Sequence, residues 1–328
     1  MAIIEVKDLK KTYTYHKKAP GLLNSMKSLF KRETLTTEAV KGINFTVEEG
    51  ELVGFLGPNG AGKTTTLKML AGILYPTSGT ATVLGYTPWE RKSVYQKQFS
   101  IVMGQKNQLW WDLPAMESFL LNKEIYEIPD DQFRRTLDEL STLLDLNDVL
   151  DVQVRKLSLG QRMKAELTAA LLHSPKVLFL DEPTIGLDVV SQQRMRDFVR
   201  SYNDQKKTTI ILTSHYMEDV AALAKRVVII NQGAVFYDGP LTGLVSKINQ
   251  VKTVRMTFTG DVPKESVVKF GEVVEHTLRT ATLRVPRADS TRRTATMLNE
   301  LPIDDITIEE EPIDDIIRQI FLDNARAT

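Results

Sequence analysis

The 328-residue chain is 42% hydrophobic and 26% charged, the composition of a soluble globular protein, and its length predicts two domains. Its 42 basic and 42 acidic residues balance, so no overall positive field indicates a nucleic-acid partner. The absence of cysteine excludes disulfides, thiolate metal sites and cysteine nucleophiles, which is typical of a reducing cytoplasm.

The N-terminal region predicts a β layer. Its first residues lack the apolar core of a signal peptide, and no run of about 18 apolar residues in the chain predicts a membrane span. Residues 2–6 and 43–47 are predicted to be strands. Between them, residues 16–38 form a lysine-rich insertion with a stretch of helical spacing. A basic amphipathic helix there could contact anionic lipid headgroups or a partner, although packing on its own domain is the favoured interpretation.

The segment GPNGAGKTT, residues 57–65, has the context of a phosphate-binding loop. It follows an apolar strand at residues 52–56 and precedes a helix, and its glycines let backbone N–H groups converge on an anion. Lys63 can then reach the β- and γ-phosphates, and the Thr64 hydroxyl can ligate Mg²⁺. The nucleotide-binding residues predicted in this loop are Gly57, Asn59, Gly60, Ala61, Gly62, Lys63, Thr64 and Thr65.

Beyond the loop, the sequence alternates between strand and helix patterns. Residues 114–150 have helical spacing, which indicates a helical subdomain, at about residues 105–165, inserted into an α/β core. The alternation predicts a parallel, doubly wound sheet. The further strands are predicted at residues 80–84, 100–103, 177–180, 208–213 and 227–230.

Two acidic residues follow the apolar run at residues 177–180. Asp181 and Glu182 therefore emerge at the carboxyl edge of the predicted sheet, where doubly wound folds bind ligands. Asp181 suits a carboxylate on the metal side of a nucleotide site, and Glu182 suits a base that polarises an attacking water.

The helix before that strand begins with a capping box. Ser158 is followed three positions later by Gln161, and Gly160 between them would let an anion approach the free N–H groups. Taken alone, this would be an ordinary capped helix. The order of motifs along the chain gives it a second interpretation.

The character of the sequence changes after residue 240. Predicted strands and helices then follow in the order β-α-β-β-α-β, that of a ferredoxin-like domain, and an apolar helical face is predicted at residues 313–322. Nothing here resembles a catalytic site, so residues 245–328 are interpreted as an accessory domain that regulates or dimerises. The strands are predicted at residues 251–258, 273–278, 280–285 and 305–308, and the helices near residues 263–270 and 290–301.

The ordered set of phosphate loop, Gln105, LSLGQ, VLFLDEP, GLD and His215 resembles the nucleotide-binding subunit of ATP-binding-cassette (ABC) transporters. The resemblance covers about residues 1–240. It implies a P-loop NTPase cassette with a parallel sheet core, an antiparallel β layer and an inserted helical subdomain, to which the small α+β domain is added.

The resemblance also implies roles for individual residues. Glu182 would be the catalytic base, His215 would contact the γ-phosphate, and Gln105 would link Mg²⁺ and water to the membrane partner. Tyr13 falls where the family stacks an aromatic ring on adenine, with Tyr15 as the alternative. The implied metal site is Thr64, Gln105 and Asp181, the implied signature motif is Ser158, Leu159, Gly160 and Gln161, and the implied D-loop is Gly186, Leu187 and Asp188.

One motif departs from the family pattern. The signature reads LSLGQ where the family more often has LSGGQ, but the serine and the second glycine keep their places, so we expect function to survive. The GLD sequence and the α/β tail resemble those of bacterial exporters for drugs, lipids or glycans.

The family implies a dimer of two copies in which two ATP molecules are bound head to tail. The expected protein is a Mg²⁺-dependent ATPase, peripheral on the cytoplasmic side of the membrane, that energises a separate transmembrane permease, with export as the expected direction. No nucleic-acid partner is expected.

Two alternative functions account for fewer of these motifs. A soluble cassette ATPase acting on nucleic acid or ribosomes would typically show tandem cassettes, coiled-coil arms or zinc motifs, and none is visible. A kinase or switch GTPase that shares only the phosphate loop would leave LSLGQ and His215 without a role.

Overall fold

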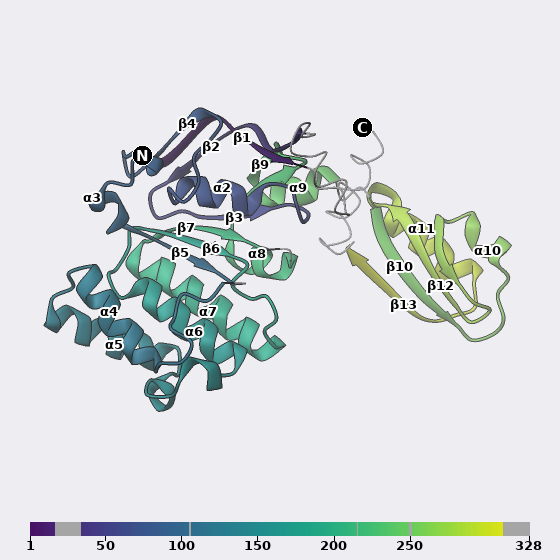
Figure 1. Ribbon diagram of the computed structural model, residues 1–328. Helices are drawn as coiled ribbons and strands as arrows, with labels where there is room; N and C mark the ends of the chain where they lie inside the picture. Colours follow the sequence, from purple (N-terminus) through teal and green to yellow (C-terminus); the bar gives the residue numbers. More distant parts are fainter. Residues whose placement is uncertain (17–33, 105, 215, 249–250, 311–328) are drawn as a thin grey trace, which may run out of the picture. The chain divides into compact units, whose positions relative to one another are not determined.

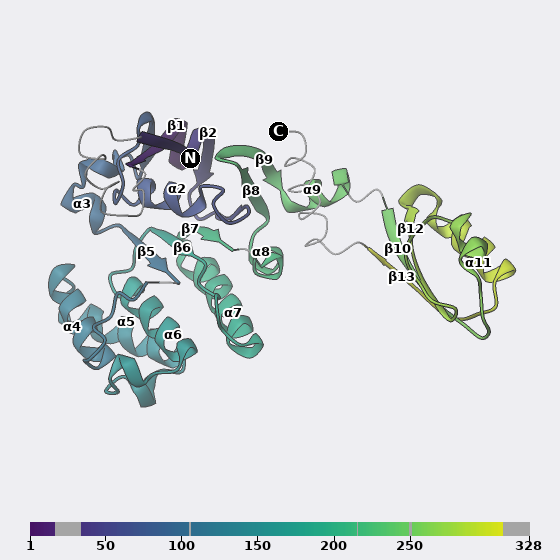
Figure 2. The same ribbon diagram turned by 45° about the vertical axis from the view of Figure 1, so that its right-hand side comes forward.

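The computed structural model describes residues 1–16, 34–104, 106–214, 216–248 and 251–310, with the backbone alone for His16, Thr34 and residues 245–248. The chain divides into two compact units, Met1–Gly239 and Pro240–Thr328. Figures 1 and 2 show the same ribbon from two directions, and each unit is taken here by itself.

An antiparallel sheet, in the order β2-β1-β4, forms one layer of the first unit. Its strands are β1 (Ala2–His16), β2 (Thr34–Glu48) and β4 (Ser78–Val83). β1 and β2 are longer than predicted and take in the two ends of the expected insertion, because their alternating threonine, tyrosine and leucine residues favour a strand. Residues 17–33, with the predicted basic helix, lie outside the described residues.

The central sheet has the order β5-β6-β7-β3-β8-β9, and its first five strands pair in parallel, as predicted. Strands β3, β6 and β7 are buried along their whole length, which explains why each is a continuous apolar run. The strands are β3 (Leu52–Leu56), β5 (Phe99–Met103), β6 (Val177–Asp181), β7 (Thr209–Thr213), β8 (Arg226–Asn231) and β9 (Ala234–Pro240).

Helices cover both faces of this sheet. Helix α2 (Lys63–Leu70) lies between the central sheet and the antiparallel layer, while α6 (Leu159–Leu171) and α7 (Val189–Lys206) lie on the other face (Figure 1). The predicted helical subdomain contains α4 (Ala115–Ile125) and α5 (Asp130–Leu143). The shorter helices of the unit are α3 (Ser93–Gln96), α8 (Met217–Leu223) and the 3₁₀ turns Pro88–Glu90, Asn147–Val149 and Val154–Lys156.

The second unit has the predicted ferredoxin-like topology. Its strands form an antiparallel sheet in the order β11-β12-β10-β13, and α10 and α11 fall between strands as the β-α-β-β-α-β order requires. Its own core lies around Val254, Leu283 and Met297. The elements are α9 (Leu241–Ile248), β10 (Val251–Phe258), α10 (Lys264–Val268), β11 (Glu272–His276), β12 (Thr280–Pro286), a 3₁₀ turn (Arg287–Asp289), α11 (Ser290–Glu300) and β13 (Ile303–Glu310).

None of the helices within the described ranges is both long enough and apolar enough to cross a membrane. The helix predicted at residues 313–322 lies outside those ranges.

Candidate functional site

The phosphate loop connects β3 to α2 and curls around the Lys63 side chain. Lys63 is only 5% exposed, and its Nζ donates hydrogen bonds to the carbonyl oxygens of Gly57 at 2.6 Å and Pro58 at 3.1 Å. Burial lowers the pKa of Lys63, while the nearby carboxylates of Glu182 and Asp181 act in the opposite direction. The loop therefore places an ammonium group on its inner side, where it can bind an anion.

Gly62 shows why the loop needs its glycines. It has a φ of +107° directly before α2, and a Cβ there would lie 2.4 Å from the carbonyl oxygen of Ala39 in β2. Strand β2 of the antiparallel layer thus lies so close to the loop that only glycine fits at residue 62.

Two of the three predicted metal ligands, Thr64 and Asp181, lie together. Oδ1 of Asp181 accepts hydrogen bonds from Thr64 Oγ1 at 3.1 Å and from Thr213 Oγ1 at 2.6 Å. A hydroxyl and a carboxylate oxygen are hard ligands that fit Mg²⁺. Among the described residues no group of three or more His, Asp or Glu side chains could hold a metal ion.

Glu182 begins the turn after β6. Its φ is +55°, and its backbone N–H bonds both the carbonyl and the hydroxyl oxygen of Thr213, each at 3.1 Å. Gly104 packs against this turn, because a Cβ there would lie 2.2 Å from the carbonyl oxygen of Glu182. The ends of β5, β6 and β7 are therefore locked together around the acidic pair.

A cavity of about 580 Å³ joins these groups. It brings the phosphate loop, Asp181 and Glu182 to one space, and it adds Lys68 and Lys106, which the sequence patterns did not single out. Its lining consists of Ala39, Asn59, Gly60, Ala61, Gly62, Lys63, Thr64, Thr65, Lys68, Met103, Lys106, Asp181, Glu182 and Ile185.

Tyr13 lies beside the phosphate loop. Its hydroxyl is 3.5 Å from Thr65 Oγ1, and Lys11 Nζ lies 5.4 Å from its ring centroid. Tyr15, two residues further along β1, is half exposed. The geometry favours Tyr13 over Tyr15 for a nucleotide contact.

The signature residues are built as predicted but lie apart from the cavity. Ser158 caps α6: its Oγ accepts from the Gln161 N–H at 3.2 Å, and Gln161 Oε1 accepts from the Ser158 N–H at 2.9 Å. Ser158 and Leu159 are exposed. Neither they nor Gly160 and Gln161 are among the lining residues of the phosphate-loop cavity.

The predicted D-loop packs against the start of α6. A Cβ at Gly186 would lie 2.9 Å from Leu159 Cδ2, and one at Gly160 would lie 3.1 Å from Ser191 Oγ. Asp188 caps α7 by accepting from the Ser191 N–H at 2.9 Å and the Ser191 hydroxyl at 2.6 Å, which lowers the pKa of Asp188. The two helix starts thus form one exposed surface.

Two predicted residues, Gln105 and His215, lie outside the described residues. Thr213, by contrast, was missed. It pairs with Asp181 in the β6–β7 register and holds both acidic residues. The sequence could have indicated Thr213 only through its place at the end of the strand that neighbours β6, which ends at Asp181.

Comparisons with known proteins agree on the family. Residues 40–185 match the family ABC transporter, and residues 250–309 match the family EvrA-like ABC transporter, C-terminal domain. The ABC transporter ATP-binding protein NatA of Bacillus subtilis is 34% identical over 215 residues, 66% of this chain and 87% of NatA. The linearmycin resistance ATP-binding protein LnrL of the same organism is 34% identical over 221 residues, 67% of this chain and 70% of LnrL.

Solved structures give the same fold. The ATP-binding subunit of an ABC transporter superposes with a TM-score of 0.62 at 26% identity, covering 75% of this chain and 92% of that chain. A dimeric ATP-binding cassette in a post-hydrolysis state bound to ADP and Pi superposes with a TM-score of 0.60 at 21% identity, covering 73% and 98%.

Proposed function

The chain belongs to the ATP-binding proteins of ABC transporters, and from that premise we propose how its residues hydrolyse ATP and what the hydrolysis drives. It is an ATPase subunit with a P-loop NTPase cassette. The observation that carries the residue assignments is the meeting of Lys63, Thr64, Asp181 and Glu182 at one cavity.

Each of these side chains has a distinct part in the proposed reaction. Lys63 and the loop N–H groups bind the phosphates. Thr64 and Asp181 would hold Mg²⁺, with Gln105 as the third ligand that the family resemblance implies; the ion neutralises charge on the phosphates when bound. Glu182 polarises the attacking water, and Thr213 keeps Asp181 and Glu182 in place. We assign the γ-phosphate contact to His215 on the resemblance alone.

The second wall of the site comes from another copy of the chain. The capped start of α6 is exposed and is not part of this chain's own phosphate-loop cavity. A helix N-terminus facing the γ-phosphate stabilises the dimer only while that phosphate is attached. Two chains therefore close head to tail on ATP and separate after hydrolysis.

The closure would move a separate permease at the cytoplasmic face of the membrane. The printed names of relatives include a linearmycin resistance protein, a bacitracin transport protein of Bacillus licheniformis and a Nod factor export protein of Burkholderia orbicola. These names support export as the direction for this chain. Nothing supports the alternative of a nucleic-acid or ribosome ATPase.

We assign residues 1–240 to the ATPase cassette and residues 245–328 to an accessory domain. The ferredoxin-like topology of the second unit and its match to a C-terminal domain of ABC transporters support this division. We propose a regulatory or dimerising role for this domain.

The test replaces the proposed base. The Glu182→Gln variant keeps the shape of the side chain but cannot accept the water proton, so we expect its kcat to fall at least about 100-fold while ATP still binds. ATP and Mg²⁺ should then trap a dimer in size-exclusion chromatography, and ADP should not. Turnover at the wild-type rate would contradict the assignment of the base.

A further inference from the structure

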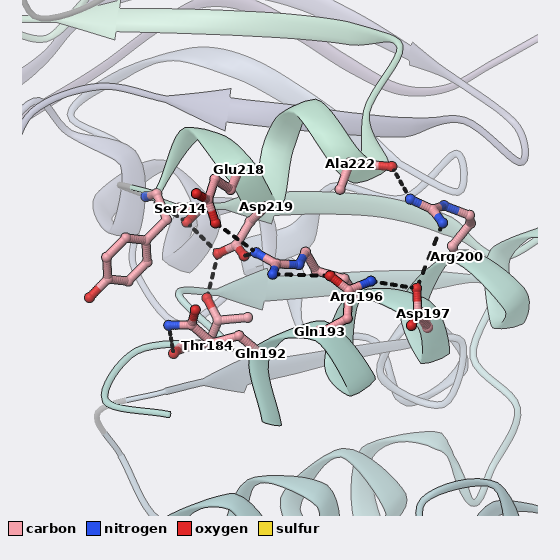
Figure 3. A network of polar contacts seen from close by, with 11 residues as sticks. Thr184, Gln192, Gln193, Arg196, Asp197, Arg200, Ser214, Glu218, Asp219 and Ala222 are labelled. Carbon is pink, nitrogen blue, oxygen red and sulfur yellow. Dashed lines mark hydrogen bonds and ion pairs between the residues drawn. The ribbon is translucent and has the colours of Figure 1, made fainter. Parts of the chain in front are cut away.

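A buried carboxylate outside the phosphate-loop cavity joins the turns that follow two neighbouring strands. Asp219, in the first turn of α8, is 1% exposed and accepts hydrogen bonds from three side chains (Figure 3). Thr184 Oγ1 and Ser214 Oγ bond its Oδ2 at 2.5 and 2.8 Å, and Arg196 Nη1 of α7 bonds its Oδ1 at 3.0 Å. All three donors are themselves buried.

Two of the three donors come from segments that carry the proposed catalytic residues. Thr184 lies two residues after Glu182, in the turn that leads to Gly186 and Asp188. Ser214 lies directly before His215 in the sequence. Its Oγ also accepts a hydrogen bond from the backbone N–H of Tyr216 at 2.9 Å. The turn after β6 and the turn after β7 therefore share one anchor.

This anchor is not an ordinary surface ion pair. A buried carboxylate is destabilising unless it is paired and hydrogen-bonded. Asp219 meets both conditions only while the turn after β6, the turn after β7 and helix α7 all stay in place. The adjacent Glu218 also approaches Arg196, at 3.6 Å, but its side chain is 78% exposed. Solvent can replace that contact, whereas it cannot reach the one at Asp219.

We propose that Asp219 is a positioning residue for ATP hydrolysis, which fixes the turn after β6 against the turn after β7 and thereby keeps Glu182 in register with the segment that carries His215. This inference rests on the proposed function of those two residues. Neither Asp219 nor any of its three donors is among the lining residues of the phosphate-loop cavity. Its loss should therefore slow hydrolysis and spare ATP binding.

The first experiment compares two neutralised acids on α8. In Asp219→Asn an NH₂ donor replaces one of the two acceptor oxygens. This donor faces either the Arg196 guanidinium or the two hydroxyl groups, which then lose their acceptor. We expect kcat to fall about tenfold, with KM for ATP within about twofold of the wild type. The matched control Glu218→Gln has the same charge change next to the same arginine and should keep the wild-type kcat.

The second experiment removes the donors one at a time. Thr184→Val and Ser214→Ala should each lower kcat about three- to tenfold, and Thr184→Ser should restore it. In the Asp219→Asn background, both deletions should have little further effect, since the shared acceptor is already lost. The single deletions and the Thr184→Ser rescue decide the question even if Asp219→Asn does not fold.

The outcomes separate this inference from the proposed function. If Asp219 only stabilised the fold, the number of titratable ATP sites would fall together with the activity. That result would overturn the inference. So would a wild-type kcat for Asp219→Asn, or hydroxyl deletions whose effects do not depend on Asp219. In each case Glu182→Gln would still show its effect. A wild-type chain without ATPase activity would overturn the proposed function and this inference with it.

Discussion

Lys63 is held by the protein in a state that favours anion binding. Its ammonium group is buried and donates hydrogen bonds to two loop carbonyls, and the acidic pair at the end of β6 lies near it. Burial disfavours the charged form, so a phosphate that approaches this group gains a strong charge-assisted hydrogen bond. We therefore expect the charge of Lys63 to contribute directly to nucleotide affinity.

Removing this amine should weaken ATP binding. Because a hydrogen bond to a charged group contributes about 1.5–3 kcal/mol, we expect Lys63→Ala to raise the Kd for ATP about 10- to 100-fold. Isothermal titration calorimetry would measure the change. Lys92→Ala, which removes an exposed lysine paired with Glu90, is the control and should keep the wild-type Kd. Unchanged ATP binding by Lys63→Ala would contradict the phosphate-loop assignment.

Individual residues differ in how far the sequence predicts them. Lys63 and Thr64 belong to a spacing that has one physical use, and the structure brings them to Asp181 and Glu182 as expected. Thr213 could not be singled out in this way, because a threonine at a strand end has many uses. Its function depends on the β6–β7 register, which no local pattern encodes.

At the scale of elements, one histidine joins three segments of the first unit. His173 follows the end of α6, and its ring stacks on Tyr126 after α4 with centroids 3.9 Å apart. Its Nε2 lies 3.2 Å from the carbonyl oxygen of Phe99 in β5. The helical subdomain is thus attached to the edge of the central sheet through a partly buried ring.

Acid should weaken this attachment. Burial lowers the pKa of His173 from 6.5 to about 4, so between these values the unfolded chain binds a proton that the folded chain does not. The free energy of unfolding should therefore fall as the pH drops from about 6.5 to 4, and His173 should contribute no further loss below that.

Urea unfolding followed by tryptophan fluorescence would measure this dependence. All three tryptophans, Trp89, Trp110 and Trp111, belong to the first unit, so the signal reports on that unit alone. A His173→Phe variant keeps an aromatic ring against Tyr126 but does not titrate, and its stability should change less over the same pH range. Equal slopes for the wild type and the variant would contradict this account.

The elements themselves were predicted unevenly. The strands of the second unit were found with the correct order because turn residues separate short alternating runs. The extension of β1 and β2 was missed, since the lysine-rich segment between them obscured two strand ends that pair only with each other. As with Thr213, local sequence patterns do not encode which distant strands pair with each other.

At the scale of the whole molecule, the proposed ATP site is completed by a second chain. The phosphate loop, Asp181 and Glu182 share a cavity, while the capped start of α6 and the turn at Gly186 form an exposed surface elsewhere. If the site is completed in trans, a defect in one chain's loop and a defect in another chain's signature affect different sites of a mixed dimer.

Mixing two inactive variants should therefore restore activity. Lys63→Ala disables the loop and leaves the signature intact, whereas Ser158→Arg places a bulky cation at the helix start and leaves the loop intact. In a head-to-tail dimer of the two, one site combines both defects and the other combines both intact halves. A one-to-one mixture forms mixed dimers half of the time, so about a quarter of the wild-type ATPase sites should be intact.

The control mixture must lack the complementary intact halves. A chain that carries both Lys63→Ala and Ser158→Arg, mixed with Lys63→Ala alone, provides no intact loop and should stay inactive. Losing the Ser158 cap lowers helix stability by about 1 kcal/mol, which a folded cassette tolerates. If the first mixture were as inactive as the second, each site would have to be built within one chain, and the exposed start of α6 would need another partner.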